Sequence, residues 1–320
     1  MKRLLISATI LAFLALQMSC AAQKFGLAPE ADKYNATVTW NNKIDILWII
    51  DNTPSMQQHQ TILANQIGAF ADGLSTRNLD FHLGVTTSNI STDGERGKLI
   101  GNPKVLTGST PNFRNQFVSR VVLPEVDHYE QGLGAMKKAI EIGSNDNAGF
   151  FRADAFLVVV VFSNEDDHSE GNAQDYINFL ESYKKPTQFG ERMWTFHTLA
   201  VMGTAGEGCS TNGQFTEPGY EYMGMTNFSG GIKTSICVSD FKQALSGIEK
   251  KLWDSTAKFI LDRIPVVESI EVRINGELVP NDAVNGWTYH EEDNSIRLHG
   301  TSVARIDSSL TINYNPTTAK

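Results

Sequence analysis

The sequence predicts a doubly wound α/β fold with a mostly parallel sheet, followed by a small all-β domain. Two runs of mainly branched apolar residues, at 46–50 and 155–162, are typical of strands that are buried on both faces of a parallel sheet. Between and after these runs, apolar residues recur at helical spacing. After Trp253 the spacing changes to a period of two, which is typical of antiparallel strands.

Each element is predicted from its own pattern. Alternating apolar residues predict strands, and apolar residues three and four positions apart predict helices that cover the sheet. In chain order, the pattern predicts a strand at 46–50, a helix at 56–74, strands at 78–87 and around 104–106, a loop and helix at 129–140, a strand at 155–162, a helix at 173–183, a strand at 193–201, and a helix capped by Ser239 or Asp240.

Residues 1–20 have the features of a secretory signal, with two basic residues ahead of an apolar core. Gln17-Met18-Ser19-Cys20 resembles a loose bacterial lipoprotein box, which predicts that Cys20 carries lipid. Cleavage after Ala22 by ordinary signal peptidase is the alternative. Residues 21–42 are polar and predict a linker. We therefore expect a secreted protein of the bacterial cell envelope, an outer-membrane lipoprotein on the periplasmic or the surface side.

Composition and net charge limit the number of domains and the kinds of partner that the chain can have. The chain is 41% hydrophobic and 20% charged, enough for one large domain at 43–255 and a small β domain at 256–320. The net charge is −9, and the mature chain is more acidic still because the signal is basic. This charge argues against nucleic acid as a partner. No later segment is long and apolar enough to span a membrane, so we expect membrane attachment only through the lipid.

The sequence contains three cysteines, of which Cys20 belongs to the processing site. The other two, Cys209 and Cys237, are predicted to pair in an oxidising compartment. Such a bond closes a loop of about 29 residues and stabilises by a few kcal/mol in the loop-entropy picture. We therefore predict that the Gly-, Ser- and Thr-rich segment at 203–235 is a surface excursion pinned by this disulfide.

Oxygen-bearing side chains follow the first buried strand directly. Asp51, Thr53 and Ser55 alternate just past its carboxyl end, where open α/β sheets bind ligands. One carboxylate and two hydroxyls from one tight loop suit a hard cation such as Mg²⁺. The alternative for Asp51 and Ser55 is a turn followed by a helix cap.

This loop resembles the Asp-x-Ser-x-Ser motif of the von Willebrand factor A-like family, with Thr53 in place of the first Ser. The replacement keeps the hydroxyl. The resemblance covers roughly residues 43–253, because two later stretches occur in the order of the family's other metal loops.

Both later stretches depart from the family's pattern. Counting back from Ala135-Met136 places Glu130 where the family has a metal-binding Thr, although a Glu near a helix start is also favoured by the helix dipole. After the strand at 155–162, Asn164 stands where the family has an Asp, and Asp166 is a competing donor. The resemblance implies that Glu130 and Asn164 exchange which loop carries the second carboxylate.

In the resembled family, an Asp or Glu of a partner completes the coordination of the metal. The resemblance thus implies an adhesion or interaction protein that binds an acidic protein or cell-surface ligand through Mg²⁺, with Ca²⁺ or Mn²⁺ as alternatives. A metal-free recognition or scaffold lipoprotein of the envelope is the alternative function. We expect no enzyme, since the sequence has no Gly-x-Ser-x-Gly elbow, His-Glu-x-x-His pair or phosphate loop.

Overall fold

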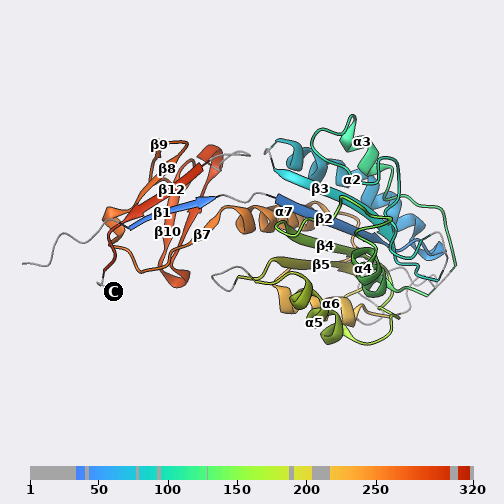
Figure 1. The fold of residues 1–320 in the computed structure, drawn as a ribbon. Helices are drawn as coiled ribbons and strands as arrows, with labels where there is room; N and C mark the ends of the chain where they lie inside the picture. The colour runs from blue at the N-terminus through green and yellow to red at the C-terminus, as the bar shows by residue number, and fades with distance from the viewer. Residues whose placement is uncertain are drawn as a thin grey trace, which may run out of the picture.

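The computed structural model describes residues 34–39, 43–76, 79–91, 95–127, 129–186, 191–203, 217–302 and 309–317. The predicted signal segment, Cys20 and Cys209 lie outside these residues, so lipidation and the disulfide stay predictions. Figure 1 shows the described chain as two parts, an α/β domain and a smaller part made of antiparallel strands, which we call the β module.

One five-stranded parallel sheet forms the centre of the α/β domain. Its strands are β2 (Lys43–Ile50), β3 (Asp80–Thr87), β4 (Phe156–Phe162), β5 (Trp194–Ala200) and β6 (Lys233–Ser235). They are arranged in the order β3-β2-β4-β5-β6. Nearly every residue of β2 and β4 is buried, as expected for inner strands that are covered on both faces.

Helices cover both faces of this sheet (Figure 1). They are η1 (Pro54–Met56), α2 (Gln57–Thr76), α3 (Phe113–Val118), α4 (Gly132–Glu141), α5 (Ala173–Tyr183), α6 (Tyr220–Ser229) and α7 (Lys242–Thr256). One hydrophobic layer joins α2, α3 and α7 to side chains such as Trp48, and the other joins α4, α5 and α6 to side chains such as Leu47. The predicted doubly wound α/β fold is confirmed.

The β module contains two antiparallel sheets. Its elements are β1 (Tyr34–Thr39), β7 (Lys258–Ile260), η2 (Val267–Ser269), β8 (Glu271–Ile274), β9 (Glu277–Val279), β10 (Trp287–His290), η3 (Glu291–Asp293), β11 (Ser295–Leu298), η4 (Gly300–Ser302) and β12 (Ser309–Tyr314). The sheets have the orders β1-β12-β8-β9 and β10-β11-β7, and they share one apolar core. Asn275 and Gly276 join β8 to β9 with φ of 51° and 84°, as a tight hairpin turn requires.

The structure corrects the predicted linker at 21–42. Residues 34–39 form β1, which pairs antiparallel with β12 along its whole length. This pairing satisfies backbone groups that would otherwise form an open edge of β12. The α/β domain is therefore inserted between the first strand of the β module and the others.

Two further predictions need correction. The strand predicted around 104–106 is reduced to one bridge, between Leu83 and Leu106. The segment at 203–235, predicted to be a surface excursion, contains α6 and β6. Helix α6 forms because Tyr222 and Met225 are buried in the layer with α4 and α5. Among the described residues, no helix has the length and apolar character needed to cross a membrane.

Candidate functional site

Three predicted loops meet at the carboxyl edge of the parallel sheet. Asp51 directly follows β2, and its backbone N–H donates to the carbonyl of Phe162 at the end of β4 over 2.9 Å. The backbone N–H of His168, in the loop after β4, donates to the carbonyl of Glu130 over 2.7 Å. Backbone hydrogen bonds therefore fix the three loops relative to one another.

A network of short polar contacts, the Asp51 network, joins Asp51, Thr53, Ser55, Ser163 and Asn164. Asp51 is fully buried; its Oδ1 accepts from the N–H and Oγ1 of Thr53 over 2.9 and 2.8 Å, and its Oδ2 accepts from Ser163 Oγ over 2.8 Å. Thr53 Oγ1 lies 3.2 Å from Ser55 Oγ, which donates to Asn164 Oδ1 over 3.3 Å. Because Thr53 gives its proton to Asp51, the lone pairs of that hydroxyl can face a cation.

Glu130 brings a second buried carboxylate to this edge, just before α4. Glu130 is only 4% exposed. Burial, together with the negative charges of Asp51 and Glu165, raises the pKa of Glu130 to about 8. Charge at this edge is therefore costly unless a proton or a cation compensates for it.

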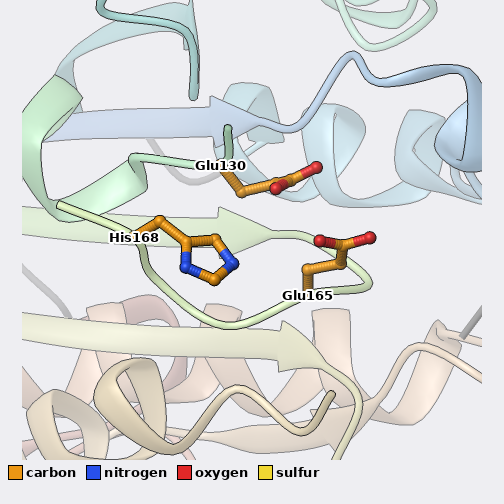
Figure 2. Close-up of side chains that lie close together, drawn as sticks. All are labelled: Glu130, Glu165 and His168. Carbon is orange, nitrogen blue, oxygen red and sulfur yellow. The ribbon is translucent and has the colours of Figure 1, made fainter. Parts of the chain in front are cut away.

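Glu130 also belongs to a second set of donors, the Glu130 triad, with Glu165 and His168. One donor atom from each lies within 4.8 Å of the others. Figure 2 shows the two carboxylates extending in the same direction and the imidazole turned toward Glu165. Sequence reasoning did not select Glu165 or His168 as ligands, although both belong to the acidic run that follows β4.

The predicted ligand Asp166 serves a different element. Its Oδ1 accepts from the backbone N–H of Asp167 and from that of Glu221 in the first turn of α6, each over 2.9 Å. Asp167 in turn accepts from the backbone N–H of Leu133 in α4 over 2.9 Å, and burial raises the pKa of Asp167 to about 6. The structure thus directs both carboxylates to helix starts, where they satisfy open N–H groups.

The donor set of the Asp51 network fits a hard divalent cation. It offers one carboxylate, hydroxyls and an amide oxygen, with Glu130 beside it, and such ions are bound through oxygen. The next residue after Asp51, Asn52, is also buried. Its Nδ2 donates to the carbonyl of Pro124, but its buried Oδ1 has no hydrogen-bond partner within the described part of the chain.

Comparisons with known proteins identify no family. No protein-family model and no curated protein matches the sequence. Among solved structures, proximal thread matrix protein 1 from the mussel byssus matches at a TM-score of 0.42 and 12% identity, over 72% of this chain and 52% of that chain. The ArnB paralog VWA2 from Sulfolobus acidocaldarius matches at a TM-score of 0.34 and 11% identity, over 89% and 60%.

A third match is the pilus adhesin SpaC from Lactobacillus rhamnosus GG in its open conformation, at a TM-score of 0.45 and 12% identity. It covers 88% of this chain and 42% of the adhesin. This chain therefore corresponds to between 42% and 60% of the lengths of these structures. The strand order and the helix layers described above establish the α/β architecture.

Proposed function

We propose that this chain is a von Willebrand factor A-like adhesion or interaction protein whose partner binding depends on a divalent cation. One observation supports this most. Four of the residues selected from the sequence, Asp51, Thr53, Ser55 and Asn164, come from two loops and form one connected network. Glu130, selected from a third loop, is close enough for the charge of Asp51 to raise its pKa.

The side chains have different tasks in this proposal. The hydroxyls of Thr53 and Ser55, with Asn164 Oδ1, would hold Mg²⁺, or Ca²⁺ or Mn²⁺ in its place. Asp51 supplies charge behind them and is itself held by the Ser163 hydroxyl. When bound, the ion supplies attraction for an oxygen ligand of a protein or cell-surface partner.

The surface around the site suits contact with a protein. Tyr129, next to Glu130, is 78% exposed, and Tyr220, at the start of α6, is 60% exposed. Exposed tyrosines are enriched where proteins bind one another, because they offer a large apolar ring with a polar tip. We infer that a partner contacts these rings while one of its oxygens reaches the ion.

Thermal unfolding tests the cation. The melting temperature of the purified protein is compared in EDTA and in millimolar Mg²⁺, Ca²⁺ or Mn²⁺. At ~100 times the dissociation constant, a bound ion adds roughly 2.7 kcal/mol to the free energy of unfolding. Asp51→Ala should abolish this increase, whereas Asp72→Ala, which removes a surface carboxylate on α2, should keep it.

The same melting curves decide between the two candidate functions. A cation-dependent rise that Asp51→Ala removes supports the cation-dependent reading. Identical curves in every condition would overturn it and leave the metal-free scaffold of the cell envelope.

The cellular location is part of the proposal. A lipid on Cys20 would attach the protein to the envelope. Incorporation of a labelled fatty acid tests this: the label should appear in the wild-type chain and be absent from Cys20→Ser. Equal labelling of both would contradict lipidation at Cys20.

A further inference from the structure

The Glu130 triad offers a different chemistry from the Asp51 network. The Asp51 network presents oxygen donors alone, which suits Mg²⁺ and Ca²⁺. The triad presents two carboxylates and an imidazole within 4.8 Å of one another. Imidazole nitrogen is a typical ligand of Zn²⁺ and Fe²⁺, and it is a poor one for the hard alkaline-earth ions.

His168 is held firmly for an exposed residue. Its own backbone N–H bonds to Glu130, and the residues on either side of it are tied to the first turn of α4. Asp167 accepts from the backbone N–H of Leu133 over 2.9 Å, and Ser169 Oγ accepts from that of Gly134 over 2.8 Å. The Tyr129 ring also packs at an edge-to-face angle, with its centre 6.0 Å from the centre of the imidazole. The backbone that carries His168 is thus held in place before any ion arrives, which lowers the entropic cost of binding.

The three side chains of the Glu130 triad differ in their exposure to solvent. Glu130 is buried, Glu165 is partly buried and His168 is exposed. An ion can therefore enter from solvent on the side of His168, and water can complete its coordination there. In Figure 2, Glu130 lies before α4 and the other two side chains lie on the loop after β4.

We propose that Glu130, Glu165 and His168 form a second cation position, which binds a transition-metal ion of the Zn²⁺ class beside the position in the Asp51 network.

A second ion changes which partner the site accepts, and this consequence rests on the proposed function. Asp51 and Glu130 already balance the two charges of one divalent ion, and Glu165 adds a further negative charge. With all three carboxylates ionised, a single ion leaves one negative charge in excess, so it attracts an acidic partner less strongly than two ions do. Two divalent ions carry four positive charges against three carboxylates, so the pair regains attraction for a carboxylate from outside.

His168 also has a neighbour that competes for it. Its Nε2 lies 3.0 Å from Glu217 Oε1, a contact that is exposed on both sides. An ion at the triad would either replace this contact or take Glu217 as a further ligand. Exposed polar contacts contribute little to stability, so giving up this one costs little.

Cobalt tests the position directly, because Co²⁺ replaces Zn²⁺ in such sites and its visible absorption reports nitrogen and oxygen ligands. Metal-free protein is titrated with Co²⁺ in millimolar Mg²⁺, which keeps the Asp51 network occupied. We expect one Co²⁺ per chain in the wild type. His168→Ala and Glu165→Gln should each weaken binding by roughly 10- to 100-fold or more.

Two controls separate this position from the first. Glu170→Gln changes an exposed carboxylate of the same loop and should leave Co²⁺ binding unchanged. Asp51→Asn should lose the stabilisation by Mg²⁺ and still bind Co²⁺ through His168. No Co²⁺ absorption in the wild type, or equal binding by His168→Ala, would overturn the second position while leaving the first intact. Loss of Co²⁺ binding in Asp51→Asn, in a folded protein, would also overturn it, because it would reduce the two positions to one.

Discussion

The two edges of the parallel sheet differ in how the negative charges of their carboxylates are balanced. At the amino edge, the fully buried Asp45 of β2 accepts from Arg152 Nε over 2.8 Å, and Arg152 Nη1 reaches Asp80 over 2.6 Å. At the carboxyl edge, the neighbours of Asp51 are hydroxyls, and Glu130 lies beside two other carboxylates. The amino edge completes its charge balance within the chain. The carboxyl edge concentrates negative charge that a cation from outside can satisfy, which supports the proposal that this edge binds the cation.

Removing the positive charge that balances the carboxylates of the amino edge should have the largest effect on the free energy of unfolding. Arg152→Ala removes the guanidinium that donates to the buried carboxylate of Asp45. The backbone N–H of residue 152 still donates to that carboxylate. We expect a loss of about 3–5 kcal/mol in the free energy of unfolding, because an unpaired buried charge is strongly unfavourable. Urea unfolding at neutral pH measures it.

A double variant checks the cause of this loss. Asp45→Asn added to Arg152→Ala removes the unpaired charge and should recover part of the lost stability. A loss in Arg152→Ala no larger than that of a surface substitution would show that the amino edge is not balanced by this pair.

The second effect sharpens the contrast at the carboxyl edge. Thr53→Val keeps the shape of a buried side chain but removes the hydroxyl that joins Asp51 to Ser55. In EDTA we expect a cost on the order of 1 kcal/mol for the lost hydrogen bond. The roughly 2.7 kcal/mol expected from saturating Mg²⁺ should disappear as well. Unfolding with and without Mg²⁺ measures both, and Thr53→Ser, which keeps the hydroxyl, should retain the stabilisation by Mg²⁺.

The third effect concerns the sheet interior, between the two edges. His197 of β5 is fully buried, accepts from the backbone N–H of Ile232 over 3.0 Å, and its pKa is lowered to about 3, mainly by burial. Below pH 6.5, His197 therefore binds a proton in the unfolded chain but stays neutral in the folded protein. The free energy of unfolding thus falls as the pH falls from 6.5 toward 3. The loss is about 1.4 kcal/mol for each pH unit, or roughly 2 kcal/mol at pH 5.

His197→Asn separates this contribution from that of the acidic edge. Its amide oxygen can replace Nδ1 as the acceptor, but it takes up no proton in this range. Between pH 7 and pH 5 the wild type should lose more stability than the variant, by the amount given above. Equal losses would mean that His197 is not the acid-sensitive group.

The smallest effect is expected from the outer pair of the amino edge. Lys43 Nζ lies 2.6 Å from Asp154, and both side chains are largely exposed. Water screens such a pair, so Lys43→Ala should leave the urea midpoint unchanged within error. A clear loss would mean that the whole amino edge, and not Arg152 alone, carries the charge balance.

Patterns that are local in the sequence predicted most of the α/β domain. The apolar runs of β2 and β4 and the spacing of α5 are complete within one segment, and the structure places them as expected. Asp51, Thr53 and Ser55 could be selected for the same reason, since one tight loop positions all three. Helix α6 was missed because its Gly- and Thr-containing segment has no clear apolar stripe, and burial of Tyr222 decides its conformation.

The remaining parts of the site depend on contacts between distant segments. Four consecutive side chains from Glu165 to His168 can bind a cation or cap a helix. Which of them faces Glu130 is decided by hydrogen bonds to α4 and α6, as the capping by Asp166 shows. The sequence shows which side chains can donate electron pairs to a cation. The folded path of the loop decides which of these side chains face one another. Strand β1 was missed although Tyr34, Ala36 and Val38 alternate with polar residues, because its partner β12 lies at the far end of the chain.

That pairing has a consequence for the order of folding. The strands of the α/β sheet all lie between β1 and β7 in the chain, so this sheet can form as soon as those residues leave the ribosome. Strand β1 precedes the other described strands in the chain but must wait for β12, which follows them. Pairings that close such long loops form slowly. We therefore expect the α/β domain to fold first and to hold the two ends of the β module within reach of each other, so that the inserted domain guides the assembly of the module that carries it.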